Sequence, residues 1–235
     1  MSIQEHVNTV KETIATAARA AGRDPEEVTL CAATKVQTDD TIRRAIAAGI
    51  TVCGENRVQE LTAHLAAGAY AGAQVHFIGH LQTNKVKQVV GKAALIHSVD
   101  SQRLLQAIDS QAGKLGLVQD ILLEVNIAGE ESKGGCTPRE AEELAALAEE
   151  LDHVRLRGLM AIPPISPEPG ANRPFFAAMR QLFVDIKGKM AHNQDDMDCL
   201  SMGMSGDYAD AIAEGSTLVR VGTALFGPRP PMTRQ

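Results

Sequence analysis

Short apolar runs alternate with amphipathic stretches along the whole chain. Runs rich in β-branched and aliphatic residues predict strands at 28–34, 50–55, 74–80, 94–100, 120–128, 155–162, 199–204 and 217–226. The stretches between them predict helices at about 38–48, 56–67, 83–91, 101–115, 137–151, 174–192 and 206–214, and another at about 2–22. Strands of near-continuous apolar character, separated by helices, indicate a parallel sheet that is covered on its outside.

Eight strand–helix units in 235 residues favour one closed (β/α)₈ barrel, an α/β TIM barrel. We therefore expect a single domain over 1–235, with the helix at about 2–22 and a tail at about 228–235 lying at its periphery. A doubly wound open sheet is the alternative, because the count of eight rests on the pattern alone.

Composition and charge exclude several classes of protein. The chain is 44% hydrophobic and 22% charged, as in ordinary globular proteins, and has no run long and apolar enough to span a membrane. The net charge of −6, the 3% aromatic content and the lack of a Lys/Arg cluster argue against nucleic-acid binding. We expect a cytoplasmic protein, since the N-terminal stretch is amphipathic and does not resemble a signal peptide.

The cysteine and histidine positions do not predict a metal site or a disulfide. The four cysteines contain no C-x-x-C pair, and three of them lie in apolar runs where cysteine behaves as a small buried hydrophobe. His76 and His80 are four residues apart, but on a strand this spacing is weak evidence for metal.

Polar residues gather where the predicted strands end, which in a barrel of this class is the functional face. Lys35 directly follows the run LCAAT. A lysine there either lays its stem along apolar surface with its head in water, or is a partly desolvated amine that attacks a carbonyl. The residues themselves leave both interpretations open.

Two further segments predict an anion site near this lysine. The stretch SMGMSGDYADAI (201–212) is a glycine-containing loop that leads into a helix, and it carries Ser201 and Ser205. The second segment, Arg220 to Thr223 on the last predicted strand, includes Gly222, which permits close approach of a ligand. Barrel closure makes Arg220 a neighbour of the lysine strand, so the three features predict a pocket for a phosphorylated aldehyde.

Between residues 31 and 227 the chain carries the runs AATK, CGENRVQE, HFIGHLQTNK, RLRGLMAI, LSMGMSGDYADAI and GSTLVRVGTALFG. On these runs the chain resembles the YggS/PROSC family of pyridoxal 5′-phosphate (PLP) homeostasis proteins. The resemblance implies a single PLP-binding barrel of fold type III, related to the cofactor domain of alanine racemases.

The resemblance also implies roles for individual residues. Lys35 matches the lysine that holds PLP as an imine, and Arg220 matches the arginine that faces the pyridine nitrogen. The positions that match the phosphate side are Ser201, Ser205, Gly222 and Thr223, and those that match the pocket lining are Asn56, His80 and Met160.

Lys133 matches a surface lysine that the family is described as using for a second, looser PLP contact. At two other places the family pattern is not matched. A second lysine common in relatives is replaced by Gln37, and a basic tail is reduced to Arg229 and Arg234. These departures bear on secondary PLP contacts and leave the main site intact.

We expect a PLP carrier that acts in cofactor homeostasis, delivery to apoenzymes and amino-acid balance, without robust catalysis. An arginine at the pyridine nitrogen stays cationic and disfavours ring protonation, which weakens the electron sink. The racemases supply a second base, a tyrosine, from an extra domain that we expect this chain to lack. Of the two tyrosines, we expect Tyr70 at the surface and Tyr208 in the pocket lining.

Three alternatives stay open. The first is a low-activity amino-acid racemase of the same fold type, and the second is a Schiff-base aldolase that acts on phosphorylated sugars. The third is a module for a protein partner in which PLP is structural. Without the second domain of the racemases, we also expect a monomer.

Overall fold

The computed structural model describes residues 2–130, 133–164, 166, 168–192 and 194–228. Eight parallel strands close into a barrel in which each strand pairs with the next and the last pairs with the first. They are β1 (Thr29–Ala33), β2 (Val52–Glu55), β3 (Gln74–Phe77), β4 (Leu95–Val99), β5 (Gln119–Val125), β6 (Val154–Ala161), β7 (Cys199–Ser201) and β8 (Leu218–Val221). The predicted (β/α)₈ barrel is confirmed, and the open sheet is excluded because it would leave two edges unpaired.

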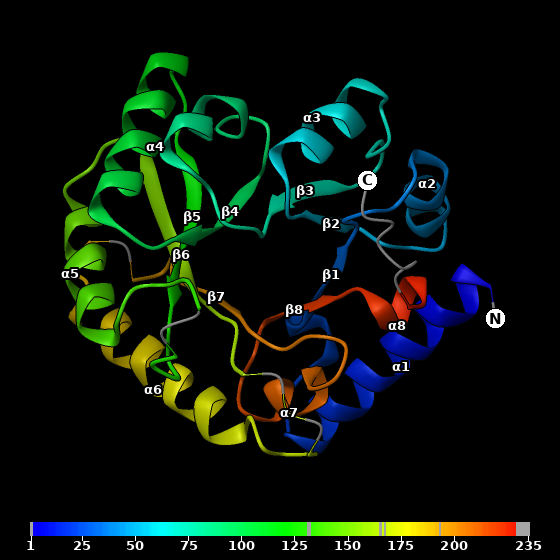
Figure 1. Ribbon diagram of the computed structural model, residues 1–235. Coiled ribbons are helices and arrows are strands. Elements are labelled where there is room, and N and C mark those ends of the chain that lie inside the picture. The colour runs from blue at the N-terminus through cyan, green and yellow to red at the C-terminus, as the bar shows by residue number, and fades with distance from the viewer. Residues whose placement is uncertain (1, 131–132, 165, 167, 193, 229–235) are drawn as a thin grey trace.

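Helices surround the strands in chain order (Figure 1). They are α1 (Ile3–Ala20), α2 (Asp39–Ala47), α3 (Val58–Ala66), α4 (Gln102–Leu115), α5 (Pro138–Glu149), α6 (Arg173–Lys189), α7 (Tyr208–Ala213) and α8 (Thr223–Phe226). The predicted helix at about 2–22 is α1, which packs against α7 and α8 beside the seam where β8 meets β1. Except for Pro228, the predicted tail at about 228–235 lies outside the described residues.

Two predicted elements differ from the structure. The helix expected at 83–91 is a 3₁₀ helix, η2 (Thr83–Gln88), and a second 3₁₀ helix, η1 (Pro25–Glu27), precedes β1. The strand expected at 217–226 ends at Val221, and the chain turns at once into α8. Apolar residues continue into α8 because that short helix is itself packed against the core, so hydrophobicity alone did not mark the boundary.

Strand residues alternate between two packing regions. Along β1, Cys31 and Ala33 pack inside the barrel with Val52 and Leu218, whereas Ala32 belongs to the larger core between strands and helices. The inside is therefore filled by side chains and is not a pore. At the next inward position after Ala33, strand β1 has ended and the chain reaches Lys35.

The cysteines are unpaired, as expected, and burial raises the pKa of each thiol; for Cys53 it is about 12. Among the described residues, no helix is long and apolar enough to cross a membrane.

Candidate cofactor site at the carboxyl ends of the strands

Lys35 begins a tight turn that directly follows β1. The Gln37 amide N–H donates to the Thr34 carbonyl over 3.0 Å, which closes the turn around Lys35 and Val36. Val36 has φ of 61°, the left-handed region that a β-branched residue adopts only under strain. Its N–H donates to Glu60 Oε2 over 3.3 Å. The half-buried lysine is thus presented by a constrained piece of backbone.

A buried carboxyl group on β2 anchors this turn from behind. Glu55 Oε1 accepts hydrogen bonds from Thr34 Oγ1 at 2.6 Å and from the Tyr70 hydroxyl at 2.8 Å. Glu55 Oε2 is buried with no hydrogen-bond partner in the described part of the chain, and burial raises the pKa of the carboxyl group. The prediction of a surface position for Tyr70 is wrong, because its ring packs in the core and its hydroxyl reaches Glu55.

The β8–β1 seam brings the predicted anion segments beside the lysine strand. Ser205 Oγ accepts from the amide N–H groups of Gly222 at 3.1 Å and Ala224 at 3.3 Å. A Cβ atom on Gly222 would lie 3.5 Å from Ala33 Cβ, two residues before Lys35. Backbone donors therefore converge at the end of β8, next to the end of β1.

The sequence predicted that Thr223 lies on the last strand. The structure places it at this seam, but outside the strand. It is the first residue of α8 and its side chain is exposed. Ser205 is also not a helix cap, because α7 begins after Asp207 and the Ser205 hydroxyl is engaged by the residues around Thr223. As a result, the Ser205 hydroxyl and the amides at the start of α8 lie together at the seam.

Arg220 is held inside the barrel by three acceptors. Its Nη1 donates to Ser201 Oγ and, over 2.8 Å, to the Ser201 carbonyl, while Nη2 donates to the Ala161 carbonyl over 2.8 Å. Burial lowers the pKa of the guanidinium, although arginine keeps its charge at neutral pH. The result is a fixed cation whose direction is set by β6 and β7.

The structure places the pocket-lining candidates at different depths. Met160 is fully buried inside the barrel with Leu95 and Leu122. Asn56 follows β2, and its Oδ1 atom is buried without a hydrogen-bond partner among the residues described. A Cβ atom on Gly79 would lie 2.1 Å from the Asn56 carbonyl oxygen, so only glycine permits this approach.

The remaining two candidates, His80 and Lys133, lie farther out. The His80 side chain is 67% exposed, with Nδ1 3.9 Å from Asp100 Oδ2. Lys133 is half-buried in a turn where its N–H donates to the Glu130 carbonyl over 3.0 Å. The predicted roles of His80 and Lys133 in the site therefore stay predictions.

Sequence reasoning missed two buried polar residues of the barrel interior, His97 and Glu124. His97 on β4 lies 3.0 Å from Ser201 Oγ and 3.1 Å from His76 on β3. The Glu124 carboxyl group on β5 is buried, and burial together with the negative charge of Asp100 raises its pKa. The signal in the sequence was a polar residue inside an apolar run, as in ALIHSVD and DILLEVNIA.

These residues fit a phosphorylated aldehyde on chemical grounds. Lys35 supplies an amine, the amides around Gly222 supply donors for an anion, and Arg220 supplies a fixed cation. Asn56 Oδ1, which accepts no hydrogen bond from any residue that the structure describes, offers a further acceptor. The donor set, the cation and the amine all lie at the carboxyl ends of the strands.

Comparison with known proteins agrees with this picture. The family model described as "Alanine racemase, N-terminal domain" matches residues 6–230. A protein of Aquifex aeolicus named "Pyridoxal phosphate homeostasis protein" is 42% identical over 229 residues, covering 97% of this chain and 99% of the relative. The protein of the same name from Escherichia coli K12 is 40% identical over 232 residues, with 97% of each chain covered.

Solved structures give the same result. A protein of Bifidobacterium adolescentis described as "an unknown protein" superposes with a TM-score of 0.89 at 40% identity, covering 95% of this chain and 94% of its own. PipY of Synechococcus elongatus, solved with PLP bound, has a TM-score of 0.81 at 33% identity, with 96% and 100% coverage. An alanine racemase of Clostridium difficile, at 14% identity and a TM-score of 0.70, shares the fold over 98% of this chain and 57% of its own. Because full-length relatives and the family model agree, this chain belongs to the pyridoxal phosphate homeostasis protein family.

Proposed function

We propose that this chain binds PLP through Lys35 and acts in PLP homeostasis. The observation that carries the proposal is the seam between β8 and β1, where the amides of Gly222 and Ala224 converge on Ser205 Oγ beside the end of the lysine strand. When bound, PLP supplies an aldehyde that a lysine amine captures as a Schiff base and a pyridine ring that can store charge.

The chain's own residues divide the work of binding. The Ser205 hydroxyl and the amides of Gly222, Thr223 and Ala224 are the groups we propose to hold the phosphate, because backbone donors at the start of a helical turn favour an anion. Asn56 and Met160 are the residues we propose for the pocket lining. Asn56 Oδ1 has no hydrogen-bond partner among the described residues, and Met160 packs fully buried inside the barrel.

We also propose that the site holds the cofactor without robust turnover. The Arg220 guanidinium is fixed by the Ser201 and Ala161 carbonyls and remains a donor at neutral pH. A cation that faces a pyridine nitrogen opposes protonation of the ring, and the protonated ring is what stabilises carbanions. Binding and release of the cofactor are left as the dominant activity.

The partners of such a carrier are PLP itself and, as a further part of the proposal, apoenzymes that receive PLP from it. Lys133 is proposed as the second, looser contact, because its turn leaves the side chain half-exposed. The monomeric state expected from the sequence stays a prediction, which light scattering measures.

The first experiment is an absorbance titration of purified protein with PLP, followed by borohydride reduction and peptide mapping. We expect a visible Schiff-base band and a reduced pyridoxyl group on Lys35. Lys35→Ala abolishes the band, because the amine is lost. Lys92→Ala is the matched control, since Lys92 is exposed near the opposite end of the barrel, before β4 begins.

Two outcomes contradict the proposal. One is a Lys35→Ala protein that still forms the trapped adduct, and the other is pyridoxyl spread evenly over surface lysines. Chiral analysis of alanine and serine after long incubation tests the absence of robust turnover. Sustained racemisation that Lys35→Ala abolishes would favour the racemase alternative.

A further inference from the structure

Four buried polar side chains form a continuous chain through the inside of the barrel. Arg220 on β8, Ser201 on β7, His97 on β4 and His76 on β3 are all less than a tenth exposed. Arg220 Nη1 donates to Ser201 Oγ, which lies 3.0 Å from His97 Nδ1, and His97 Nε2 lies 3.1 Å from His76 Nδ1. The chain thus links the fixed cation of the cofactor site to the opposite half of the barrel.

The chemistry of arginine fixes the direction of the first two hydrogen bonds. A guanidinium only donates, so Ser201 Oγ accepts from Arg220. The Ser201 hydroxyl proton must then go to the other partner of this oxygen, which is His97 Nδ1. His97 Nδ1 is therefore an acceptor and carries no proton.

The direction of the last bond follows from the first two. A neutral His97 with a bare Nδ1 carries its proton on Nε2, and it donates this proton to His76 Nδ1. His76 is then also protonated on Nε2. The opposite tautomer of His97 would aim two donors at Ser201 Oγ and leave the serine proton without an acceptor in a fully buried position.

The surrounding charges support neutral imidazoles. Burial, then the neighbouring His76 and Arg220, hold the pKa of His97 well below its usual value. Burial lowers the pKa of His76 to about 4, and the opposing influence of Asp120 on β5 is smaller. His76 also borders a cavity of about 410 Å³ at the amino ends of the strands, together with Asp120, Arg157 and Asp198.

We propose that His97 is a positioning residue for the cofactor site. It provides the fixed acceptor that orients the Ser201 hydroxyl, and through Ser201 it holds the Arg220 guanidinium in its bound direction. His76 secures the tautomer of His97. The proposal rests on the proposed function, because it deepens the role of Arg220 in holding PLP, and it moves Ser201 from the phosphate side to the arginine side of the site.

The first test uses the protein without PLP and does not depend on cofactor binding. Long-range ¹H–¹⁵N spectra of ¹⁵N-histidine-labelled protein report which ring nitrogen carries the proton. We expect His97 and His76 to be Nε2–H tautomers that stay neutral from pH 8 down to pH 5.5, assigned with the His97→Asn and His76→Gln variants. A protonated Nδ1 on His97, or an imidazole that titrates with an ordinary pKa, would overturn the proposal.

The second test separates hydrogen bonding from packing. His97→Asn keeps an acceptor oxygen at the place of Nδ1, whereas His97→Leu fills similar space with no acceptor. We expect PLP affinity within threefold of the native value for Asn and about tenfold weaker for Leu, because the serine proton loses its buried acceptor. His192→Leu, at an exposed position, is the control with unchanged affinity.

The outcomes of the two tests are distinguishable. Equal affinity for Leu and the native protein, or equal loss for Asn and Leu, would contradict a positioning role. If native protein fails to bind PLP, the proposed function fails, and the tautomers still decide whether the interior chain has the inferred direction. If His97→Leu does not fold, the spectra of the native protein and the affinity of His97→Asn carry the test.

Discussion

Val36, next to the candidate Schiff-base lysine, is the one non-glycine residue with positive φ in the part of the chain that the structure describes. A valine in this conformation costs free energy of folding, and such strain is typical of sites where a backbone must hold a functional side chain. The strain is maintained by the Thr34–Gln37 hydrogen bond and by Glu60.

Val36→Gly is expected to raise the free energy of unfolding by about 0.5–1 kcal/mol, because glycine adopts this φ without strain and the Val36 side chain is 48% exposed. Urea unfolding of the protein without PLP measures the change. Val118→Gly is the control: Val118 is 53% exposed and does not have positive φ, so the substitution should lower stability by about 0.5–1 kcal/mol. A Val36→Gly protein less stable than native would show that the turn is not strained.

Among single residues, the sequence identified Lys35 but not the groups that hold it. Glu55 lies in the quoted run CGENRVQE, yet nothing local shows that its carboxyl group turns toward Thr34 and Tyr70. Those contacts join residues 21 and 15 positions apart, across two strands and a loop. Only the packed barrel brings them together.

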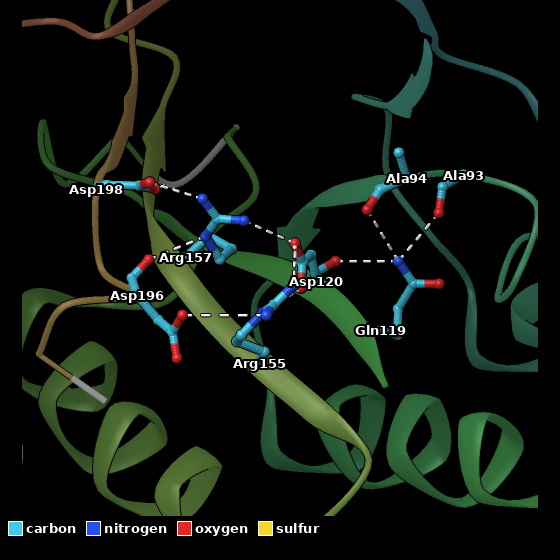
Figure 2. Close-up of polar contacts among 8 residues, drawn as sticks. All are labelled: Ala93, Ala94, Gln119, Asp120, Arg155, Arg157, Asp196 and Asp198. Atoms are coloured by element: carbon cyan, nitrogen blue, oxygen red, sulfur yellow. Dashed lines mark hydrogen bonds and ion pairs between the residues drawn. The ribbon is translucent and has the colours of Figure 1, made fainter. Parts of the chain in front are cut away.

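At the scale of secondary-structure elements, the amino ends of β5 and β6 are joined by an ion-pair network. Asp120 accepts from Arg155 Nε at 2.7 Å and from Arg157 Nη1 at 2.8 Å, and Arg157 also pairs with Asp198, the residue directly before β7 (Figure 2). The beginning of β5 is held by Gln119 as well, whose amide donates to the Ala93 carbonyl over 3.0 Å. The network connects three successive strands at the end opposite the candidate site.

Asp120→Asn is expected to lower the free energy of unfolding by about 2 kcal/mol, because it removes the carboxylate that both arginines share in a partly buried position. Glu143→Gln is the control, since the Arg139–Glu143 pair on α5 is solvent-exposed and should contribute less than about 0.5 kcal/mol. Urea unfolding in low salt measures both variants. Equal effects of the two substitutions would mean that burial adds nothing to the network.

Element boundaries were predicted where local signals are strong. The start of α5 matches its capping box, in which Thr137 Oγ1 accepts from the Glu140 N–H and the Glu140 carboxylate accepts from the Thr137 N–H. The end of β8 was missed, because the run TLVRVGTALF is apolar through both β8 and α8. Hydrophobicity marks what is buried, and here both elements are buried.

At the scale of the whole molecule, the buried imidazoles make stability depend on pH. His76 is neutral in the folded protein because burial lowers its pKa to about 4, whereas in the unfolded chain it titrates near 6.5. Below pH 6.5 the unfolded state therefore binds more protons than the folded state. Folding stability falls as pH decreases from 6.5 toward 4 on account of this group.

His76→Gln is expected to lose less stability than the native protein as pH falls through this window. The difference between the two proteins should shift in favour of the variant by up to about 1.4 kcal/mol per pH unit. Urea unfolding at pH 7.5, 6.0 and 5.0 measures it, and comparison of the two proteins cancels the opposite effect of Glu55 and Glu124, whose pKa values are raised. A difference that stays constant with pH would contradict a neutral, buried His76.

The sequence by itself determined the order of strands and helices and the lysine at the end of β1, and it favoured the closed barrel over an open sheet, which only the pairing of β8 with β1 excluded. These features follow from hydrophobic periodicity, caps and strand ends, which act within a few residues of one another. The tertiary structure alone decided that Ser201 lies against Arg220 and His97, and that Glu55 lies beneath the lysine turn. Strand register and barrel closure bring these groups together from positions up to 104 residues apart, and no local pattern encodes such distances.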